Sequence, residues 1–124
     1  MRAALLEVPR RASVVTRRIP EPGEGDTLVR LEGCGISSSS LPVWEGRPWF
    51  SYPLEAGAPG REGLGIEVET GRSIAFLSDR AFAEYALVLR RMVVPLPAQL
   101  DGILTRPGPR VRCGDPCTAG SREL

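Results

Sequence analysis

Short apolar runs, each closed by Pro, Gly or charged residues, dominate most of this 124-residue chain. They recur in the ranges 1–8, 12–20, 27–35, 64–70, 73–77, 82–89 and 91–96. Runs of this length between turn residues are typical of β-strands. No amphipathic pattern extends beyond about a dozen residues, the usual length of a globular helix. The pattern therefore predicts a mainly β domain, either a barrel or a sandwich.

The segment 27–35 shows strand alternation most clearly. Val29 and Leu31 share one face, opposite Leu28 and Arg30. Because successive side chains of a strand point to opposite faces, this spacing predicts a half-buried strand.

Three segments break the strand pattern. The stretch 37–46, SSSSLPVWEG, predicts one short helical turn capped by a serine. The Pro-rich, aromatic stretch 47–60 predicts an ordered loop. Residues 101–124 have no periodicity and are rich in Arg, Pro and Gly. We therefore expect a domain over residues 1–100 and an irregular tail over 101–124, a truncation or frameshift remnant.

Composition narrows the chemistry available to the chain. Hydrophobic residues make up 42%, charged residues 25%, and the formal net charge is +1, which argues against nucleic-acid and membrane-surface partners. Every basic residue is Arg, and there is no His, the commonest general base and metal ligand. An odd count of three cysteines without a signal peptide predicts reduced thiols in the cytoplasm.

Glycines frame one ion pair in the middle of the chain. The stretch GAPGREGLG, residues 57–65, surrounds Arg61 and Glu62 with four glycines. Dense glycine indicates a tight turn or a close approach of the backbone to another group. The stretch is not flanked by a strand and a helix in the manner of a dinucleotide-binding loop, so we expect no such loop here.

Six segments of the chain follow the order of a known family: MRAALLE, IPEPGEGDTLVRLEGCGIS, LPVWEGR, GREGLGIEVETG, AFAEYALV and VPLP. They resemble the N-terminal, GroES-like domain of the zinc-type alcohol dehydrogenases, in the medium-chain dehydrogenase/reductase superfamily. The resemblance covers roughly residues 1–100. The most specific part is the signature G-H-E-x-x-G, followed six positions on by Gly or Ala. Gly60, Glu62, Gly65 and Gly71 match it, and Arg61 replaces the His.

The resemblance implies a fold, a metal and a cofactor. The fold is a partly open, GroES-like β-barrel with one or two short helical turns. In the family a Rossmann domain follows and binds NAD or NADP. Zinc in the cleft between the domains polarises the alcohol or carbonyl oxygen during hydride transfer. Zinc and NAD(P) are expected in the full-length family, and neither is expected in this chain alone.

The sequence departs from the family at the metal positions. Ser37 stands where the family has a ligand Cys, and a hydroxyl is a poor zinc ligand. Arg61 stands where it has the ligand His, and a guanidinium has no acceptor to offer a cation. Glu62 is retained as a vestigial member of the cluster. No zinc is therefore expected at these positions, and the four-cysteine lobe of the family's structural zinc is missing.

The proton-relay positions are altered as well. Ser39 stands where the family often has a Ser or Thr that relays the substrate proton, so it is a vestigial catalytic position. Ser40 replaces an acidic residue that often follows, and Pro42 replaces a His that completes the relay in some members.

Arg61 is the centre of a charge-replacement hypothesis. It would supply the positive charge that zinc gives in the family, and it would pair with Glu62 or a nearby carboxylate. The substitution Arg61→Ala would then destabilise the domain. The alternatives are a solvated surface pair of little energetic weight and a working catalytic pair.

The other candidate residues also have two interpretations each. The serines 37–40 are either a turn and helix cap or a nucleophile, and the absence of a His base favours the cap. Cys34 is interpreted as a small buried hydrophobe. Cys113 and Cys117 form either a weak metal pair or part of a shifted reading frame. The aromatic residues of 44–52 either line a substrate pocket or cover the end of the barrel.

These observations predict an alcohol dehydrogenase-like N-terminal domain of oxidoreductase ancestry that is inactive alone in NAD(P)-dependent hydride transfer. The alternative is a non-catalytic binding or interaction module that pairs with a separately encoded Rossmann domain. The apolar stretch 81–97 is a candidate for the surface that would meet such a partner, and self-association is expected for the same reason.

Overall fold

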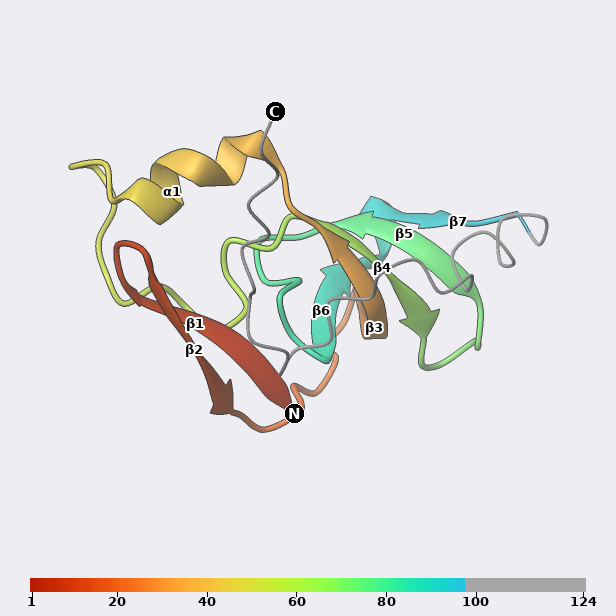
Figure 1. The fold of residues 1–124 in the computed structure, drawn as a ribbon. Coiled ribbons are helices and arrows are strands. Elements are labelled where there is room, and N and C mark those ends of the chain that lie inside the picture. The colour runs from red at the N-terminus through yellow and green to blue at the C-terminus, as the bar shows by residue number, and fades with distance from the viewer. Residues whose placement is uncertain (98–124) are drawn as a thin grey trace, which may run out of the picture.

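Residues 1–97 are described by the structure, a computed structural model, and they form a curled five-stranded sheet beside a two-stranded hairpin (Figure 1). The strands are β1 (Arg2–Val8), β2 (Arg11–Thr16), β3 (Asp26–Gly35), β4 (Glu62–Glu67), β5 (Ser73–Leu77), β6 (Tyr85–Leu89) and β7 (Val93–Pro95). The helical segments are the 3₁₀ turns η1 (Ser38–Ser40) and η2 (Arg90–Met92) and the helix α1 (Leu41–Glu45). The predicted mainly β fold, a partly open barrel with short helical turns, is confirmed.

The strands of the large sheet follow the order β6-β3-β4-β5-β7, and every neighbouring pair is antiparallel. β3 is the longest strand and pairs with both β6 and β4. Its register with β4 shifts between Leu31 and Gly33. Such a bulge bends a strand and increases its twist, which contributes to the curl of the sheet.

The buried face of β4 is not its apolar face. Gly63, Gly65 and Glu67 are buried, whereas Leu64 and Ile66 on the other face are half-buried. Packing requires a glycine at position 63, because a Cβ there would lie 2.2 Å from the ring of Phe76 on β5. An aromatic ring thus fills the space that a side chain on β4 would occupy.

The hairpin β1–β2 is tied to the sheet through residues 81–84. Ala3 forms an isolated antiparallel bridge with Ala83. The amide of Ala4 donates to the carbonyl of Phe82 at 2.8 Å. The segment 81–84 therefore joins the hairpin to the large sheet, and Figure 1 shows the hairpin lying against the side of that sheet.

The hydrophobic core lies inside the curl of the large sheet. Its buried members are Val29, Ile74, Phe76, Ala81, Ala86 and Val88, with Leu31, Cys34 and Val93 packed against them. Val29 is the buried residue predicted from the alternation of β3, while Leu31 beside the bulge is only half-buried.

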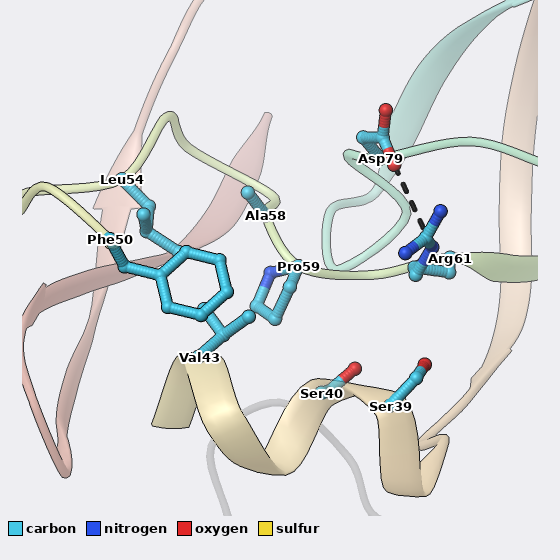
Figure 2. A pocket seen from close by; sticks show the side chains of 9 residues that line it. All are labelled: Ser39, Ser40, Val43, Phe50, Leu54, Ala58, Pro59, Arg61 and Asp79. Carbon is cyan, nitrogen blue, oxygen red and sulfur yellow. Dashed lines mark ion pairs between the residues drawn. The ribbon is translucent and has the colours of Figure 1, made fainter. Parts of the chain in front are cut away.

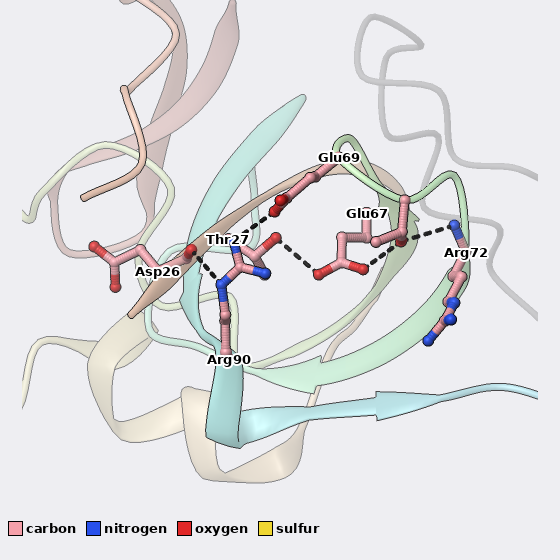
Figure 3. Close-up of polar contacts among 7 residues, drawn as sticks. Asp26, Thr27, Glu67, Glu69, Arg72 and Arg90 are labelled. Carbon is pink, nitrogen blue, oxygen red and sulfur yellow. Dashed lines mark hydrogen bonds and ion pairs between the residues drawn. The ribbon is translucent and has the colours of Figure 1, made fainter. Parts of the chain in front are cut away.

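A polar cluster around Glu67 closes one end of the sheet (Figure 3). Glu67 is 9% exposed, and its carboxylate accepts hydrogen bonds from the hydroxyls of Thr27, at 2.9 Å, and Thr70. These two bonds lower the pKa of Glu67, with Thr70 contributing most, and the charges of Arg90 and Arg72 add to the effect against the opposing effect of burial. The buried carboxylate is thereby held in its charged form.

None of the helices within residues 1–97 is long and apolar enough to cross a membrane. The expected irregular tail, residues 101–124, lies outside the described residues, as do Cys113 and Cys117.

Candidate functional site

A pocket of about 200 Å³ lies between the helical segment η1–α1 and the loop that leads into β4 (Figure 2). Its lining residues are Ser39, Ser40, Val43, Phe50, Leu54, Ala58, Pro59, Arg61 and Asp79. The apolar side chains gather at one end, and the polar ones gather where Arg61 faces the two serines. The pocket therefore offers an apolar wall with a charged, hydroxyl-bearing end.

The glycine-rich stretch holds the loop after β5 against this pocket. The amide of Ala81 donates to the carbonyl of Gly60 at 2.9 Å, and the amide of Phe82 donates to Gly57 at 3.0 Å. A Cβ on Gly60 would lie 2.3 Å from the nitrogen of Phe82, so only glycine allows this approach. The amide of Ser78 donates to the carbonyl of Arg61 at 2.9 Å, which places the following residue, Asp79, beside the Arg61 side chain.

Arg61 pairs with Asp79 and not with Glu62. Its Nε lies 3.8 Å from Oδ1 of Asp79, and the two side chains are 57% and 84% exposed. The Glu62 side chain instead lies over Gly35, where an added Cβ would be 2.9 Å from Oε2 of Glu62. An exposed pair at this distance contributes little to stability. Arg61→Ala should therefore destabilise the domain less than the charge-replacement hypothesis predicts.

The four serines divide between capping and lining. Ser37 is the N-cap of η1, and its Oγ accepts from the amide of Ser39 at 3.4 Å and from the hydroxyl of Ser39 at 3.0 Å. The predicted cap is therefore confirmed. Ser39 and Ser40 line the pocket together with Arg61, whereas Ser37 and Glu62 do not.

Cys34 lies on β3, opposite Gly63 of β4 in the register. It is half-buried, not fully buried as predicted, and it packs against the core. Burial raises the pKa of the Cys34 thiol, and the charge of Glu62 adds to this, although hydrogen bonds with the backbone of Glu62 and Arg61 lower it. A protonated thiol is neither a nucleophile nor a metal ligand.

The residues at the family's metal positions do not fit zinc. They present a hydroxyl from Ser37, a guanidinium from Arg61 and one carboxylate from Glu62, whereas zinc sites use thiolates, imidazoles and carboxylates. Within residues 1–97, no three His, Cys, Asp or Glu side chains gather where they could hold a metal ion. The absence of zinc from the whole chain stays a prediction.

One of the aromatic residues lines the pocket, and another fastens the loop. Phe50 lines the pocket, and Trp49 beside it is 71% exposed, with the two rings 6.0 Å apart. The hydroxyl of Tyr52 donates to the carbonyl of Val43 and thus fastens the loop to α1.

Sequence reasoning missed part of the lining, namely Val43, Leu54, Ala58, Pro59 and Asp79. Asp79 comes from a distant loop, and it stands in no motif that would have indicated it.

No family model matches the chain. Several curated proteins are nevertheless similar to it in sequence. The chain is 33% identical over 107 residues to prostaglandin reductase-3 of Bos taurus, an alignment that covers 77% of this chain and 28% of that protein. It is 31% identical over 80 residues to L-galactonate-5-dehydrogenase of Escherichia coli, covering 64% and 23%. The chain thus spans about a quarter of the length of these relatives.

Solved structures share the fold. The quinone oxidoreductase of Thermus thermophilus, which was also solved in complex with NADPH, matches with a TM-score of 0.68 and 26% identity, over 79% of this chain and 33% of that one. The human synaptic vesicle membrane protein VAT-1 homolog-like protein matches with a TM-score of 0.69 and 24% identity, over 79% and 36%.

Proposed function

We propose that this chain, which belongs to the zinc-type alcohol dehydrogenase (medium-chain dehydrogenase/reductase) family, forms the substrate-side domain of an oxidoreductase whose metal position is taken by an Arg–Asp pair. Its oxidoreductase ancestry follows from its relatives. The observation that supports the metal-free proposal is the pocket itself. Arg61 and Ser39, from two separate family motifs, line one pocket, and the guanidinium that replaces the ligand His pairs with Asp79.

In this proposal the chain binds and orients a substrate but does not complete hydride transfer alone. A guanidinium near a substrate oxygen would donate hydrogen bonds to it, and the adjacent hydroxyl of Ser39 would accept or pass on a proton. A dinucleotide site needs a strand, a Gly-rich turn and a helix in sequence. The only α-helix within residues 1–97 is the five-residue α1, so these residues do not fit the cofactor.

A second candidate function is an interaction module that pairs with a separate Rossmann domain. Apolar side chains stand exposed near the pocket, with Ile36 at 84% and Leu41 at 54%. Within the stretch 81–97, by contrast, the apolar residues are divided, because Val88 is buried while Val94 is 60% exposed. Exposed apolar side chains favour contact with another protein surface, and self-association is an alternative outcome.

Zinc content and nicotinamide binding test the proposal on one purified sample of the full chain. We expect elemental analysis to find no stoichiometric zinc, and fluorescence titration to find no binding of NADH or NADPH. Stoichiometric zinc would contradict the metal-free proposal, and the variant with Cys113→Ser and Cys117→Ser would then show whether those thiols hold it. Nicotinamide binding by the zinc-free chain would contradict the claim that the chain lacks a cofactor site.

A further inference from the structure

The buried hydroxyl of Ser40, which has no partner within residues 1–97, faces the pocket (Figure 2). Ser40 is 8% exposed, and its amide donates to the carbonyl of Ser37 at 3.0 Å. Its Oγ makes no hydrogen bond with any other residue in the described range 1–97, and Figure 2 shows it pointing from the helical segment into the pocket. Buried polar side chains are nearly always paired, so an unpaired one calls for a water or a ligand.

The Arg61 guanidinium, on the other side of the pocket, has N–H donors that no side chain within residues 1–97 pairs with closely. Arg61 has five N–H donors, and its one ion pair among the described residues is the 3.8 Å contact with Asp79. That distance is longer than a charge-assisted hydrogen bond, which is about 2.7–2.9 Å. A ligand oxygen placed between Arg61 and Ser40 would therefore gain hydrogen bonds that residues 1–97 do not make among themselves.

The opposite end of the pocket is apolar. Val43, Phe50 and Leu54 form this wall, away from Arg61, and Pro59 lies between the two ends (Figure 2). The volume of about 200 Å³ lies below the roughly 300–1,000 Å³ typical of pockets for drug-sized ligands. A small molecule with an apolar body and one oxygen-bearing end would match this lining.

We propose that this pocket binds a small carboxylate, with its apolar body on the Phe50 wall and its charged end between the Ser40 hydroxyl and the Arg61 guanidinium. The inference rests on the proposed function, because it names the ligand class of the same metal-free pocket. A carboxylate matches the fork of a guanidinium and accepts from a hydroxyl at the same time. It would compete with Asp79, whose 84% exposed side chain is free to turn into solvent.

The test uses two probes that differ only in charge, hexanoate and hexanamide. Each is titrated into the ¹⁵N-labelled full chain, and amide shifts are followed around Ser40 and Arg61. We expect saturable binding of hexanoate that is about tenfold tighter than that of hexanamide, since hydrogen bonds to charged groups are the stronger ones. Ser40→Ala should weaken hexanoate binding about tenfold. Asp79→Asn should tighten it, because a competing carboxylate is removed.

A charge-matched control separates the site from general electrostatics. Arg61→Gln should abolish the preference for hexanoate. Arg80→Gln removes the same charge from the neighbouring loop, where Arg80 pairs with Glu55 outside the pocket lining, and it should leave binding unchanged.

Three results would overturn the inference: equal binding of the two probes, no saturable shift near Ser40, or an equal loss in Arg80→Gln and Arg61→Gln. Equal binding would show that the pocket does not select a carboxylate, and the absence of a saturable shift would leave a water as the partner of Ser40. Zinc is measured on the same sample. If the chain holds no zinc and does not bind hexanoate, this inference alone is rejected. Stoichiometric zinc rejects the proposed function instead.

Discussion

Replacing Gly60 with Ala should separate the two segments that build the pocket. The added Cβ would lie 2.3 Å from the nitrogen of Phe82 and 2.7 Å and 2.9 Å from backbone atoms of Ala81. Backbone cannot rotate away as a side chain can, so the segments must move apart and weaken the hydrogen bonds of Ala81 to Gly60 and Phe82 to Gly57. Overpacking costs about 1–3 kcal/mol, and a hydrogen bond about 0.5–1.5 kcal/mol. With two hydrogen bonds affected, the expected loss is about 2–6 kcal/mol, against a typical domain stability of about 5–15 kcal/mol.

Urea unfolding followed by tryptophan fluorescence measures this loss. The matched control is Gly33→Ala at the β3 bulge, where an added Cβ meets nothing within 4 Å. The control should change stability by less than about 1 kcal/mol, because restricting the unfolded chain is its main effect. If Gly60→Ala and Gly33→Ala unfold at the same urea concentration, the close approach at Gly60 does not exist as described.

Two further substitutions test the charged groups. Because hydrogen bonds lower the pKa of Glu67 in the folded state, the charged carboxylate stabilises the fold above the ordinary glutamate pKa of about 4.3, and this contribution is lost as the pH falls through the lowered value. Glu67→Gln should therefore flatten the acid side of a plot of melting temperature against pH, and an unchanged acid slope would contradict the assignment. Arg61→Ala should cost no more than about 1 kcal/mol, since its pair with Asp79 is exposed and 3.8 Å long. A much larger loss in thermal unfolding would support the original charge-replacement hypothesis.

Much of the fold follows from hydrophobic patterning, and the exceptions have physical causes. The run at residues 1–8 became β1, and the alternation of 27–35 became β3. Patterning gave no indication that β4 buries its glycine face, because the space there is filled by Phe76 from the next strand. Tertiary packing, rather than the side chains of β4 itself, decides which face is inside.

The sequence predicted the site residues that lie in motifs, but not the one that comes from a distant loop. Arg61, Ser39 and Ser40 were found because they occupy positions in recognisable motifs. Asp79 was not found, since its place depends on backbone hydrogen bonds across a distance in sequence, such as that from Ser78 to Arg61. The partner of Arg61 was therefore left open between Glu62 and another carboxylate, and only the structure decides it.

The backbone contacts of residues 81–84 join three parts of the chain that are far apart in sequence. Ala4 at the N-terminus bonds to Phe82, and Phe82 in turn bonds to Gly57 at the edge of the pocket loop. Gly57 donates back to Ala4 at 2.7 Å, which closes a ring of backbone hydrogen bonds. A ring of this kind opens as one cooperative unit, so fraying of the first strand would loosen the pocket wall with it. The geometry of the pocket wall thereby depends on the integrity of the N-terminal strand.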